Sequence, residues 1–221
     1  ENSIPFCVGN IATAEAAKKL YNSGADIIKI GIGPGSICTT RMVAGIGVPQ
    51  ISAILEVKNA LKKKKIKIIS DGGIKFSGDI AKALAAGADA IMMGSIFAGT
   101  DESPGKKFKF KGKLYKQYRG MGSIGAMSSG SANRYFQKNF KDKSKFVPEG
   151  VEGRVEYKGS VSKIIYQLKG GLRSSMGYIG AKNLNQISKN AKFTKITKAG
   201  FYESMVHSVE MTQKTINYKL W

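Results

Sequence analysis

The sequence is poor in cysteine and in long apolar runs. It has two cysteines, Cys7 and Cys38, in 221 residues, which excludes a disulfide scaffold and favours a reducing, cytoplasmic setting. No apolar run reaches the roughly 18 residues of a membrane span, and the first residues lack a secretory pattern. We therefore expect no membrane partner. The chain begins with Glu1 rather than Met, so we expect the natural start to lie upstream.

Acidic residues are scarce as well. The 15 aspartates and glutamates stand against 36 lysines and arginines, which gives a formal net charge of +21. Such a charge fits a polyanionic partner such as nucleic acid. It also fits a solvated, lysine-rich surface, because the lysines are spread along the whole chain. A small phosphorylated substrate does not require so much charge, so charge alone leaves both interpretations open.

The sequence does contain enough apolar material for a folded domain. Hydrophobic residues make up 42% of it, and a mean hydropathy of -0.18 argues against a disordered tail. Short apolar runs alternate with helical stretches over roughly the first half of the chain, which predicts parallel βα units with both faces of the sheet covered. In "GDIAKALAAGA", Ile80, Ala83, Leu84 and Ala86 share one helical face that can pack on such a sheet.

The expected strands end in glycine, asparagine, aspartate or serine. "IPFCVGN" ends in Gly-Asn, "IKIIS" runs into "DGG" at 71–73, and "DAIMMGS" ends in Ser95. Ligands of α/β folds bind at the carboxyl ends of parallel strands, and late loops of a barrel often hold a phosphate. The glycines of "DGG" and "GS" let backbone N–H groups approach an anion. We expect Cys38, Asp71 and Gly94 to cluster at this edge.

The stretch "GIGPGSICTTR" places Cys38 in a loop of glycines and a proline. A buried, inert cysteine needs a packed strand or helix, whereas a reactive thiolate needs an exposed, electropositive niche. Cys38 is therefore the candidate nucleophile. Cys7 lies within an apolar run and is interpreted as a packing residue.

From about residue 100 the chain becomes rich in glycine, serine and lysine and only weakly periodic. A stretch of this length, residues 107–150, predicts a functional flap or a linker. Within it, "KKFKFKGKLYKQYRG" alternates lysines with four aromatic residues, Phe108, Phe110, Tyr115 and Tyr118. That alternation suits either a solvated hairpin or a surface on which bases stack. The segment 183–221 is expected to hold a short helix, a strand around "FTKIT" and an extended end.

Several long motifs resemble one family. They are "GIGPGSICTTRMVAGIGVPQ", "SDGGIKFSGDIAKALAAGADAIMMGSIFAGTDESPG", "YRGMGSIGAM", "NRYFQ", "VPEGVEGRV" and "QLKGGLRSSMGYIGA". In this order and spacing they resemble inosine-5′-monophosphate (IMP) dehydrogenase from Asn10 to about Ala181, and more loosely beyond. Guanosine-5′-monophosphate reductase shares the cysteine loop, "DGG" and "GS" but lacks the "RYF" flap with "YRGMG". The reductase is therefore the alternative enzyme.

The resemblance implies a (β/α)8 TIM-barrel enzyme, usually a homotetramer. Such an enzyme oxidises IMP to XMP with NAD in guanine nucleotide biosynthesis and requires a monovalent cation, K+. Cys38 would attack C2 of the purine, hydride would pass to NAD, and water would hydrolyse the covalent thioimidate. Thr40 would help to handle that water, and Arg134, with Tyr135 beside it, would be the general base. The loop composition singles out the same cysteine.

The resemblance also implies binding residues. Those expected to contact IMP are Ser36, Asp71, Gly72, Gly73, Gly94, Ser95, Tyr118, Arg119, Gly120, Met121, Gly122 and Glu149. Among them, Ser36, Gly94 and Ser95 would bind the phosphate. Asp71 would reach the ribose, and Glu149 the edge of the base. The residues expected beside NAD are Gly31, Ile32 and Gly33.

The implied cation site consists of backbone carbonyl groups. One set belongs to Gly33, Gly35 and Cys38, and a neighbouring subunit would supply the set from Glu203, Ser204 and Met205. The chain reads "ESMVHSV" where the family usually has "ESHPHDV". Main-chain carbonyls bind the ion, so the methionine need not abolish the site. His207, the single histidine, is interpreted as a packing residue rather than a catalyst.

The resemblance covers only the last four of the eight barrel strands. We expect one domain, 1–221, with the flap 107–150 and the C-terminal segment 183–221, and no regulatory CBS-type module. A half-barrel leaves sheet edges and its interior uncovered. The chain is therefore a fragment, or a partner of another copy or of an N-terminal half-barrel, or a decayed gene product. Two functions stay open: the dehydrogenase, and a basic, non-catalytic nucleic-acid-binding protein whose affinity would fall steeply with salt.

Overall fold

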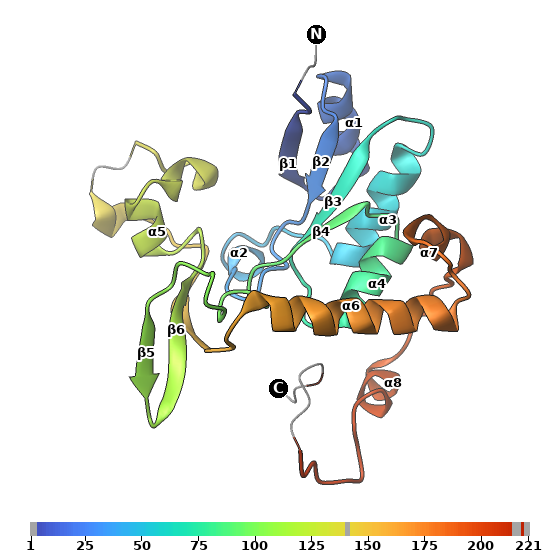
Figure 1. Cartoon of the computed structure of the whole chain (residues 1–221). Helices are drawn as coiled ribbons and strands as arrows, with labels where there is room; N and C mark the ends of the chain where they lie inside the picture. Colours follow the sequence, from blue (N-terminus) through green and yellow to red (C-terminus); the bar gives the residue numbers. More distant parts are fainter. Residues whose placement is uncertain (1–3, 140–141, 214–217, 219–221) are drawn as a thin grey trace.

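The computed structural model describes residues 4–139, 142–213 and 218, and Figure 1 shows their arrangement. The elements, in chain order, are β1 (Cys7–Ile11), α1 (Ala14–Asn22), β2 (Ile27–Ile30), α2 (Thr40–Val43), α3 (Gln50–Ala60), β3 (Lys67–Asp71), α4 (Ser77–Ala85), β4 (Ala90–Met92), β5 (Lys107–Phe110), β6 (Lys113–Arg119), α5 (Ile124–Ser128), η1 (Ser131–Tyr135), η2 (Lys143–Lys145), β7 (Glu152–Glu156), α6 (Val161–Tyr178), α7 (Leu184–Asn190) and α8 (Lys198–Glu203). The strands form a parallel and an antiparallel sheet.

The parallel sheet has four strands in the order β1-β2-β3-β4. Each strand pairs in parallel with the next one along the chain, and α1, α3 and α4 form the connections. A parallel pair needs such a crossover, because the chain must return to the starting edge of the sheet. The α/β class and the parallel sheet are therefore confirmed, and the carboxyl ends of all four strands lie at one edge.

The helices cover one face of this sheet (Figure 1). Ile28, Ile30 and Ile68 are at most 1% exposed and share a core with apolar residues of α1, α3, α4, α6 and α7. The predicted inner face of α4 is confirmed, since Ile80, Ala83 and Leu84 are at most 9% exposed. Side chains alternate between the two faces of a strand. The helix-facing residues of the sheet are therefore the ones that build the core.

The opposite face of the sheet is not covered by helices in the described part of the chain. Cys7 is exposed there, and Met92 is 44% exposed. Cys7 pairs with half-buried Ile27, whereas Val8 pairs with fully buried Ile28, which places Cys7 on the uncovered face. The predictions that both faces are covered and that Cys7 is a packing residue are therefore wrong, because these helices lie on one side only.

The flap, residues 107–150, begins with β5 and β6, which form an antiparallel sheet with β7 directly after the flap. A two-residue turn at Lys111 and Gly112 joins β5 to β6, with φ of 47° and 76° at the two positions. Two successive positive φ angles match the twist of a tight hairpin, and glycine adopts them readily. The predicted hairpin is confirmed. The rest of the flap forms a lobe with α5, η1 and η2, which stands apart from the parallel sheet in Figure 1.

The C-terminal segment contains the predicted short helix, α7, and a second one, α8. The strand predicted around "FTKIT" is wrong, because residues 191–197 form neither helix nor strand. Phe193 and Ile196 are 48% and 61% exposed. An extended segment gains little from its strand-forming residues when no neighbouring strand accepts its hydrogen bonds.

Gly31 joins β2 to the cysteine loop, and we expect its replacement by alanine to destabilise the fold. Its φ is +152°, and a Cβ would lie 2.1 Å from the carbonyl oxygen of Asp71. Relieving that contact would push β2 away from β3. Gly31→Ala should therefore lower the free energy of unfolding by about 3 kcal/mol, which urea unfolding followed by circular dichroism measures.

Gly78→Ala is the matched control for this substitution. Gly78 lies in α4, and a Cβ there would meet nothing within 4 Å. Alanine should stabilise this helix by about 0.5–1 kcal/mol relative to glycine. Equal unfolding midpoints for the Gly31 variant and the unchanged chain would contradict the tight packing at the end of β2.

Candidate active site

Three loops meet at the carboxyl edge of the parallel sheet, as the pattern of strand ends predicts. The cysteine loop follows β2, the "DGG" loop follows β3, and Gly94 follows β4. A Cβ on Gly72 would lie 2.8 Å from Cγ of Pro34, and one on Gly73 would lie 3.4 Å from its Cβ. The cysteine loop therefore rests directly on the "DGG" loop.

Cys38 takes part in a short chain of hydrogen bonds. Its half-buried thiol donates to Thr40 Oγ1 over 3.2 Å, and the Thr40 hydroxyl donates to Glu149 Oε2 over 2.7 Å. A thiol, a hydroxyl and a carboxylate thus stand in line. The arrangement has the form of a nucleophile connected through a hydroxyl to a proton acceptor.

The flap places Glu149 in this line. The Thr39 N–H donates to the Glu149 carbonyl over 2.9 Å, and the Val151 N–H donates to the Ile37 carbonyl over 3.0 Å. Cys38 itself forms an isolated bridge with Gly150. The segment before β7 therefore lies alongside the cysteine loop and carries the carboxylate to it.

Tyr135 belongs to the same cluster. Its ring lies against Gly122, where a Cβ would come within 2.8 Å of the ring carbon Cζ. Burial raises the pKa of Tyr135, and the charge and hydrogen bond of Arg134 partly offset that rise, while Cys38 and Glu149 add to it. The Tyr135 ring thus lies next to the Gly122–Glu149 contact, close to the end of the hydrogen-bonded line from Cys38, and Arg134 precedes it as an exposed residue.

Tyr118 connects the cysteine loop with the loop after β4. Its hydroxyl shares a hydrogen bond with Ser36, and a Cβ on Gly94 would lie 3.0 Å from the Tyr118 hydroxyl oxygen. Burial raises the pKa of Tyr118, which the bond to Ser36 partly offsets. Ser95, which is half-buried, follows Gly94 in the chain. These residues bring hydroxyl and backbone N–H donors to one place, which suits an anion.

Asp71 is held by residues that sequence reasoning missed. Its Oδ2 accepts from Lys29 Nζ over 2.5 Å and from Asn10 Nδ2 over 2.9 Å, across two neighbouring strands. Both side chains of the ion pair are 22% exposed. One signal was available, since Lys29 is the single charged residue in the apolar run "DIIKIGIG" after its first residue. The contacts from Lys29 and Asn10 are both made by Oδ2, so Oδ1 of Asp71 accepts no hydrogen bond from the described residues and can accept one from a ligand hydroxyl.

Gln50 is another residue that the sequence did not single out. Its Nε2 donates to the carbonyl of Ile30 over 2.9 Å and to Ser70 Oγ over 3.1 Å. Gln50 is the first residue of α3, which follows α2 and residues 44–49. It therefore fixes the start of α3 to the carboxyl ends of β2 and β3.

Not all of the expected nucleotide contacts converge. Strand alternation sends the Arg119 side chain to the face of β6 opposite Tyr118, and its Nη1 would lie 3.4 Å from a Cβ on Gly125 in α5. Met121 is 58% exposed. Gly120 does lie at the site, because a Cβ on it would come within 3.2 Å of the Ile37 carbonyl oxygen.

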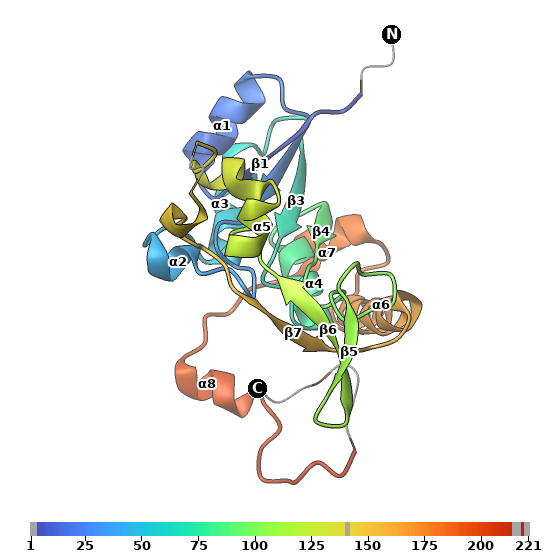
Figure 2. The same ribbon diagram turned by 90° about the vertical axis from the view of Figure 1, so that its left-hand side faces the viewer.

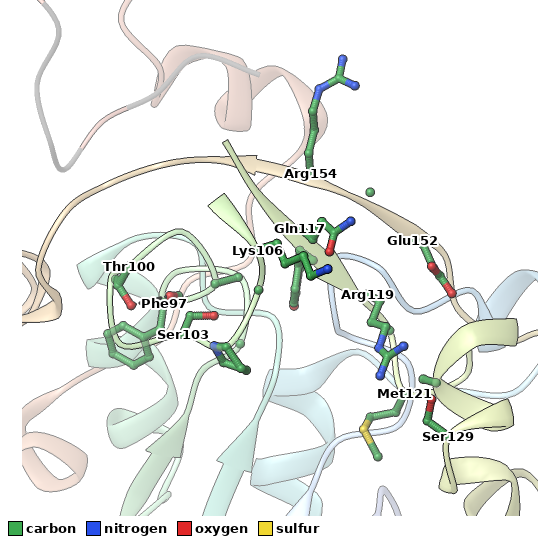
Figure 3. Close-up of a pocket in the computed structure, with 18 of the residues that line it drawn as sticks. Phe97, Thr100, Ser103, Lys106, Gln117, Arg119, Met121, Ser129, Glu152 and Arg154 are labelled. Carbon is green, nitrogen blue, oxygen red and sulfur yellow. Dashed lines mark hydrogen bonds between the residues drawn. The ribbon is translucent and has the colours of Figure 1, made fainter. Parts of the chain in front are cut away.

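A cavity of about 1580 Å³ adjoins this cluster (Figure 3). It opens between the segment after β4, the strands β6 and β7, and the helix α5, and Gly94, Tyr118 and Met121 are among its lining residues. Arg119 extends toward Met121 within it, whereas Arg154 points away (Figure 3). The cavity is large enough for a nucleotide beside the cysteine loop.

The aromatic residues of the hairpin do not form the continuous stacking surface that their alternation allowed. Phe108 pairs with Tyr115 across the strands, and the Arg154 guanidinium lies 3.8 Å from the centre of the Phe110 ring. Tyr118 is on the other face of β6 from Tyr115. The strand period of two separates Tyr118 from the other aromatic side chains, so the four rings do not form the single stacking surface that the nucleic-acid alternative would need.

The two halves of the expected cation site differ in placement. The Cys38 N–H donates to the Gly35 carbonyl over 3.1 Å, which folds residues 33–38 into a turn. Its carbonyl oxygens have the chemistry that a hard monovalent cation prefers. Glu203 ends α8, followed by Ser204 and Met205, and Figures 1 and 2 both place α8 away from α2. The chain therefore does not bring its own second set of carbonyls to the first.

The stretch expected beside NAD is only partly accessible. Gly31 is buried, whereas Ile32 and Gly33 are half-buried at the carboxyl edge. The Ile32 carbonyl accepts from the Arg41 guanidinium over 3.2 Å, which fixes this backbone. Backbone N–H and C=O groups are the partners that a carboxamide needs, so Ile32 and Gly33 fit the nicotinamide part of the cofactor.

The described residues contain neither a metal-binding cluster nor a membrane-spanning helix. Among them, no three His, Cys, Asp or Glu side chains gather as a metal site would require. Within the same residues, no helix has both the length and the apolar character needed to span a bilayer.

Comparison with known proteins identifies the family of the chain. The model of the "IMP dehydrogenase / GMP reductase domain" matches residues 1–207. The inosine-5′-monophosphate dehydrogenases of Staphylococcus saprophyticus and Aquifex aeolicus are each 57% identical, over 215 and 216 residues, which is 97% of this chain and 44% of theirs. That of Methanocaldococcus jannaschii is 57% identical over 223 residues, 98% of this chain and 45% of its own. The chain spans less than half the length of these relatives, and it belongs to the IMP dehydrogenase / GMP reductase family.

Proposed function

We propose that this chain is the C-terminal half of a (β/α)8 barrel that oxidises IMP to XMP with NAD. Four parallel strands in sequential order and the family membership support the half-barrel. The open face of the sheet is where an N-terminal half would complete the barrel interior. The partners would be IMP, NAD, that N-terminal half and further copies in a homotetramer.

The observation that carries the proposal is the line from Cys38 through Thr40 to Glu149, with 3.2 Å and 2.7 Å between the atoms. Sγ of Cys38, its proton given up to solvent, would form a bond to C2 of IMP while the ring C2–N double bond opens and leaves its electron pair on the nitrogen. The hydride on C2 would then leave with its bonding pair, which restores the ring double bond and gives a thioimidate on Cys38. NAD supplies the acceptor for that hydride when bound.

Hydrolysis would release the product. Water adds to C2 of the thioimidate, and the C2–Sγ bond breaks with its electron pair returning to Cys38. A proton must leave that water, and the Thr40 hydroxyl, already donating to Glu149, can pass it to the carboxylate. Tyr135, whose ring lies against Gly122 beside Glu149, and Arg134 before it would support the water from the flap side. The products are XMP and a reduced cofactor.

The binding groups would divide by the part of the nucleotide that they reach. Ser36, Ser95 and Tyr118 would hold the phosphate, and Oδ1 of Asp71 would accept from the ribose. Backbone carbonyls of Gly33, Gly35 and Cys38 would hold K+, which would keep the cysteine loop in shape. Ile32 and Gly33 would hold the carboxamide of NAD.

The reductase of the same family is the second enzyme to consider. Converting GMP to IMP releases ammonia and adds no water to C2, so it needs no acceptor for a water proton. The flap motif "NRYFQ", whose Tyr135 ring packs on Gly122 beside Glu149, favours the dehydrogenase, because the reductase lacks this flap. The proposal therefore assigns the dehydrogenase to this chain.

Nucleotide binding can be tested on the 221-residue chain itself. We expect isothermal titration calorimetry to show tighter binding of IMP than of inosine, which lacks the phosphate. Ser95→Ala should weaken IMP binding by about 1–3 kcal/mol and leave inosine binding unchanged, because one donor to a charged group is lost. Ser188→Ala, an exposed serine in α7, is the control. Equal affinities for IMP and inosine in the unchanged chain would contradict the proposal.

A further inference from the structure

Lys116 is a buried lysine on the inner face of β6. It is 4% exposed, and its Nζ donates to the backbone carbonyls of Thr100, over 2.6 Å, of Asp101 and of Ser103. The neighbouring carboxylates have other partners: Asp101 accepts from the Tyr157 hydroxyl over 2.7 Å, and Glu102 accepts from the backbone. Burying an ammonium is costly, and three carbonyls replace its water. Packing alone would be served by a neutral side chain.

Lys158 holds the same segment from the other side. Its Nζ donates to the carbonyl of Ile96 over 2.8 Å and of Ser95 over 3.5 Å. Its backbone N–H also donates to the Gly99 carbonyl over 2.8 Å. Lys116 in β6 and Lys158 just after β7 therefore both bind backbone carbonyls of one stretch, residues 95–103.

That stretch begins with Ser95 and directly follows Gly94, and both are expected to bind the phosphate. The N–H groups of Phe97 and Ala98 both donate to the Gly94 carbonyl over 3.0 Å, so the chain turns tightly directly after β4. Aligned peptide groups of such turns point their carbonyls away from their N–H groups. Cations on the carbonyl side thus stabilise the orientation in which Gly94 and Ser95 offer N–H groups to an anion.

Tyr118 links this arrangement to the ligand. Lys116 and Tyr118 are two residues apart on one strand and share a face. Lys116 holds the far end of the stretch while Tyr118 contacts Gly94 and shares a hydrogen bond with Ser36. The strand β6 therefore fixes the loop after β4 at both ends.

We propose that Lys116 and Lys158 are positioning residues for a phosphomonoester. They hold residues 94–103 in the shape that receives the phosphate and place two positive charges behind it, where reduced solvent strengthens their attraction to the dianion. The ligand class rests on the proposed function, since it is the 5′-phosphate of IMP. The lysines do not touch the substrate and act through the backbone that they bind.

The test uses Lys116→Met and Lys158→Met in the 221-residue chain. Methionine keeps much of the length and removes the charge. We expect each variant to bind IMP about tenfold or more weakly in calorimetry, with inosine affinity unchanged. A purely structural loss would weaken both ligands alike. Lys116→Arg, which retains the charge, should recover part of the IMP affinity.

Hydrogen exchange gives a readout that needs no ligand. The amides of Phe97 and Thr100, which donate within the turns, should exchange about tenfold faster in both methionine variants. Lys109→Met, an exposed lysine on the same hairpin, is the control and should change neither readout. Wild-type affinity for IMP or unchanged exchange in both methionine variants would overturn the inference. A wild-type chain without preference for IMP over inosine would instead overturn the proposed function.

Discussion

Replacing Cys38 with alanine is expected to abolish XMP formation in a chimera in which this chain replaces the matching part of the S. saprophyticus relative. The loss should exceed about 10⁴-fold, as for removal of other covalent nucleophiles. Without Sγ no bond to C2 can form, so the covalent intermediate from which the hydride departs is never made. No second thiol can substitute, since Cys7 begins β1 and the reacting edge lies at the other end of that strand. Each strand residue advances the chain by about 3.3 Å, so Cys7 lies the length of β1 away from the reacting edge.

Intact-protein mass spectrometry with IMP and NAD measures this directly. The unchanged chimera should carry a nucleotide-sized adduct, and the Cys38→Ala variant should carry none. IMP affinity should stay within about tenfold, because the phosphate and ribose contacts come from residues other than Cys38. Cys7→Ala is the matched control and should keep both adduct and turnover. An adduct that persists in the Cys38 variant, or that maps to Cys7, would refute the assignment of the nucleophile.

The parallel sheet was predictable because its signals are local. Short apolar runs ending in glycine, aspartate or serine marked four strands, and Ile80, Ala83 and Leu84 marked the inner face of α4. The sequence could not show which face of the sheet the helices cover. The sequence pattern of a strand is the same whether a helix or solvent lies against one of its residues. The exposure of Cys7 therefore depends on the tertiary arrangement alone.

The residue types of the site could be predicted from the sequence, but their arrangement in space could be predicted only in part. The glycine loop and the resemblance singled out Cys38, Thr40 and Glu149, whereas the bond between the last two joins positions 109 residues apart. Lys29 and Asn10 were missed as partners of Asp71 because a charged or amide side chain within a strand gives no sign of the strand beside it. Such contacts arise from register, which depends on how whole strands pair.

The flap shows a different limit. Its lysines and aromatic residues alternate with the period of a strand, which indicates the hairpin but not the side to which each ring points. Pairing of Phe108 with Tyr115 separates both from Tyr118. The buried position of Lys116 is equally hidden, since its neighbours Lys113 and Lys109 are exposed and have the same residue type.

Glu149→Gln is expected to slow hydrolysis of the thioimidate by about 10²–10⁴-fold, while the adduct still forms. The glutamine oxygen can accept from the Thr40 hydroxyl as Oε2 of Glu149 does over 2.7 Å. It cannot take up the proton that leaves the water. Adduct should therefore accumulate in the chimera, in contrast to the Cys38 variant, and rapid-quench mass spectrometry resolves its formation from its decay. Glu15→Gln, on an exposed face of α1, is the control.

A second substitution decides whether Thr40 and Glu149 act as one unit. If the hydroxyl passes the proton to the carboxylate, Thr40→Val alone should slow hydrolysis about as much as Glu149→Gln. The double variant should then be no slower than the slower single variant, because residues of one relay lose their contributions together. Independent roles would instead multiply the two losses. Additive losses, or a Glu149→Gln variant that hydrolyses its adduct at the unchanged rate, would leave the flap residues Arg134 and Tyr135 as the source of the base.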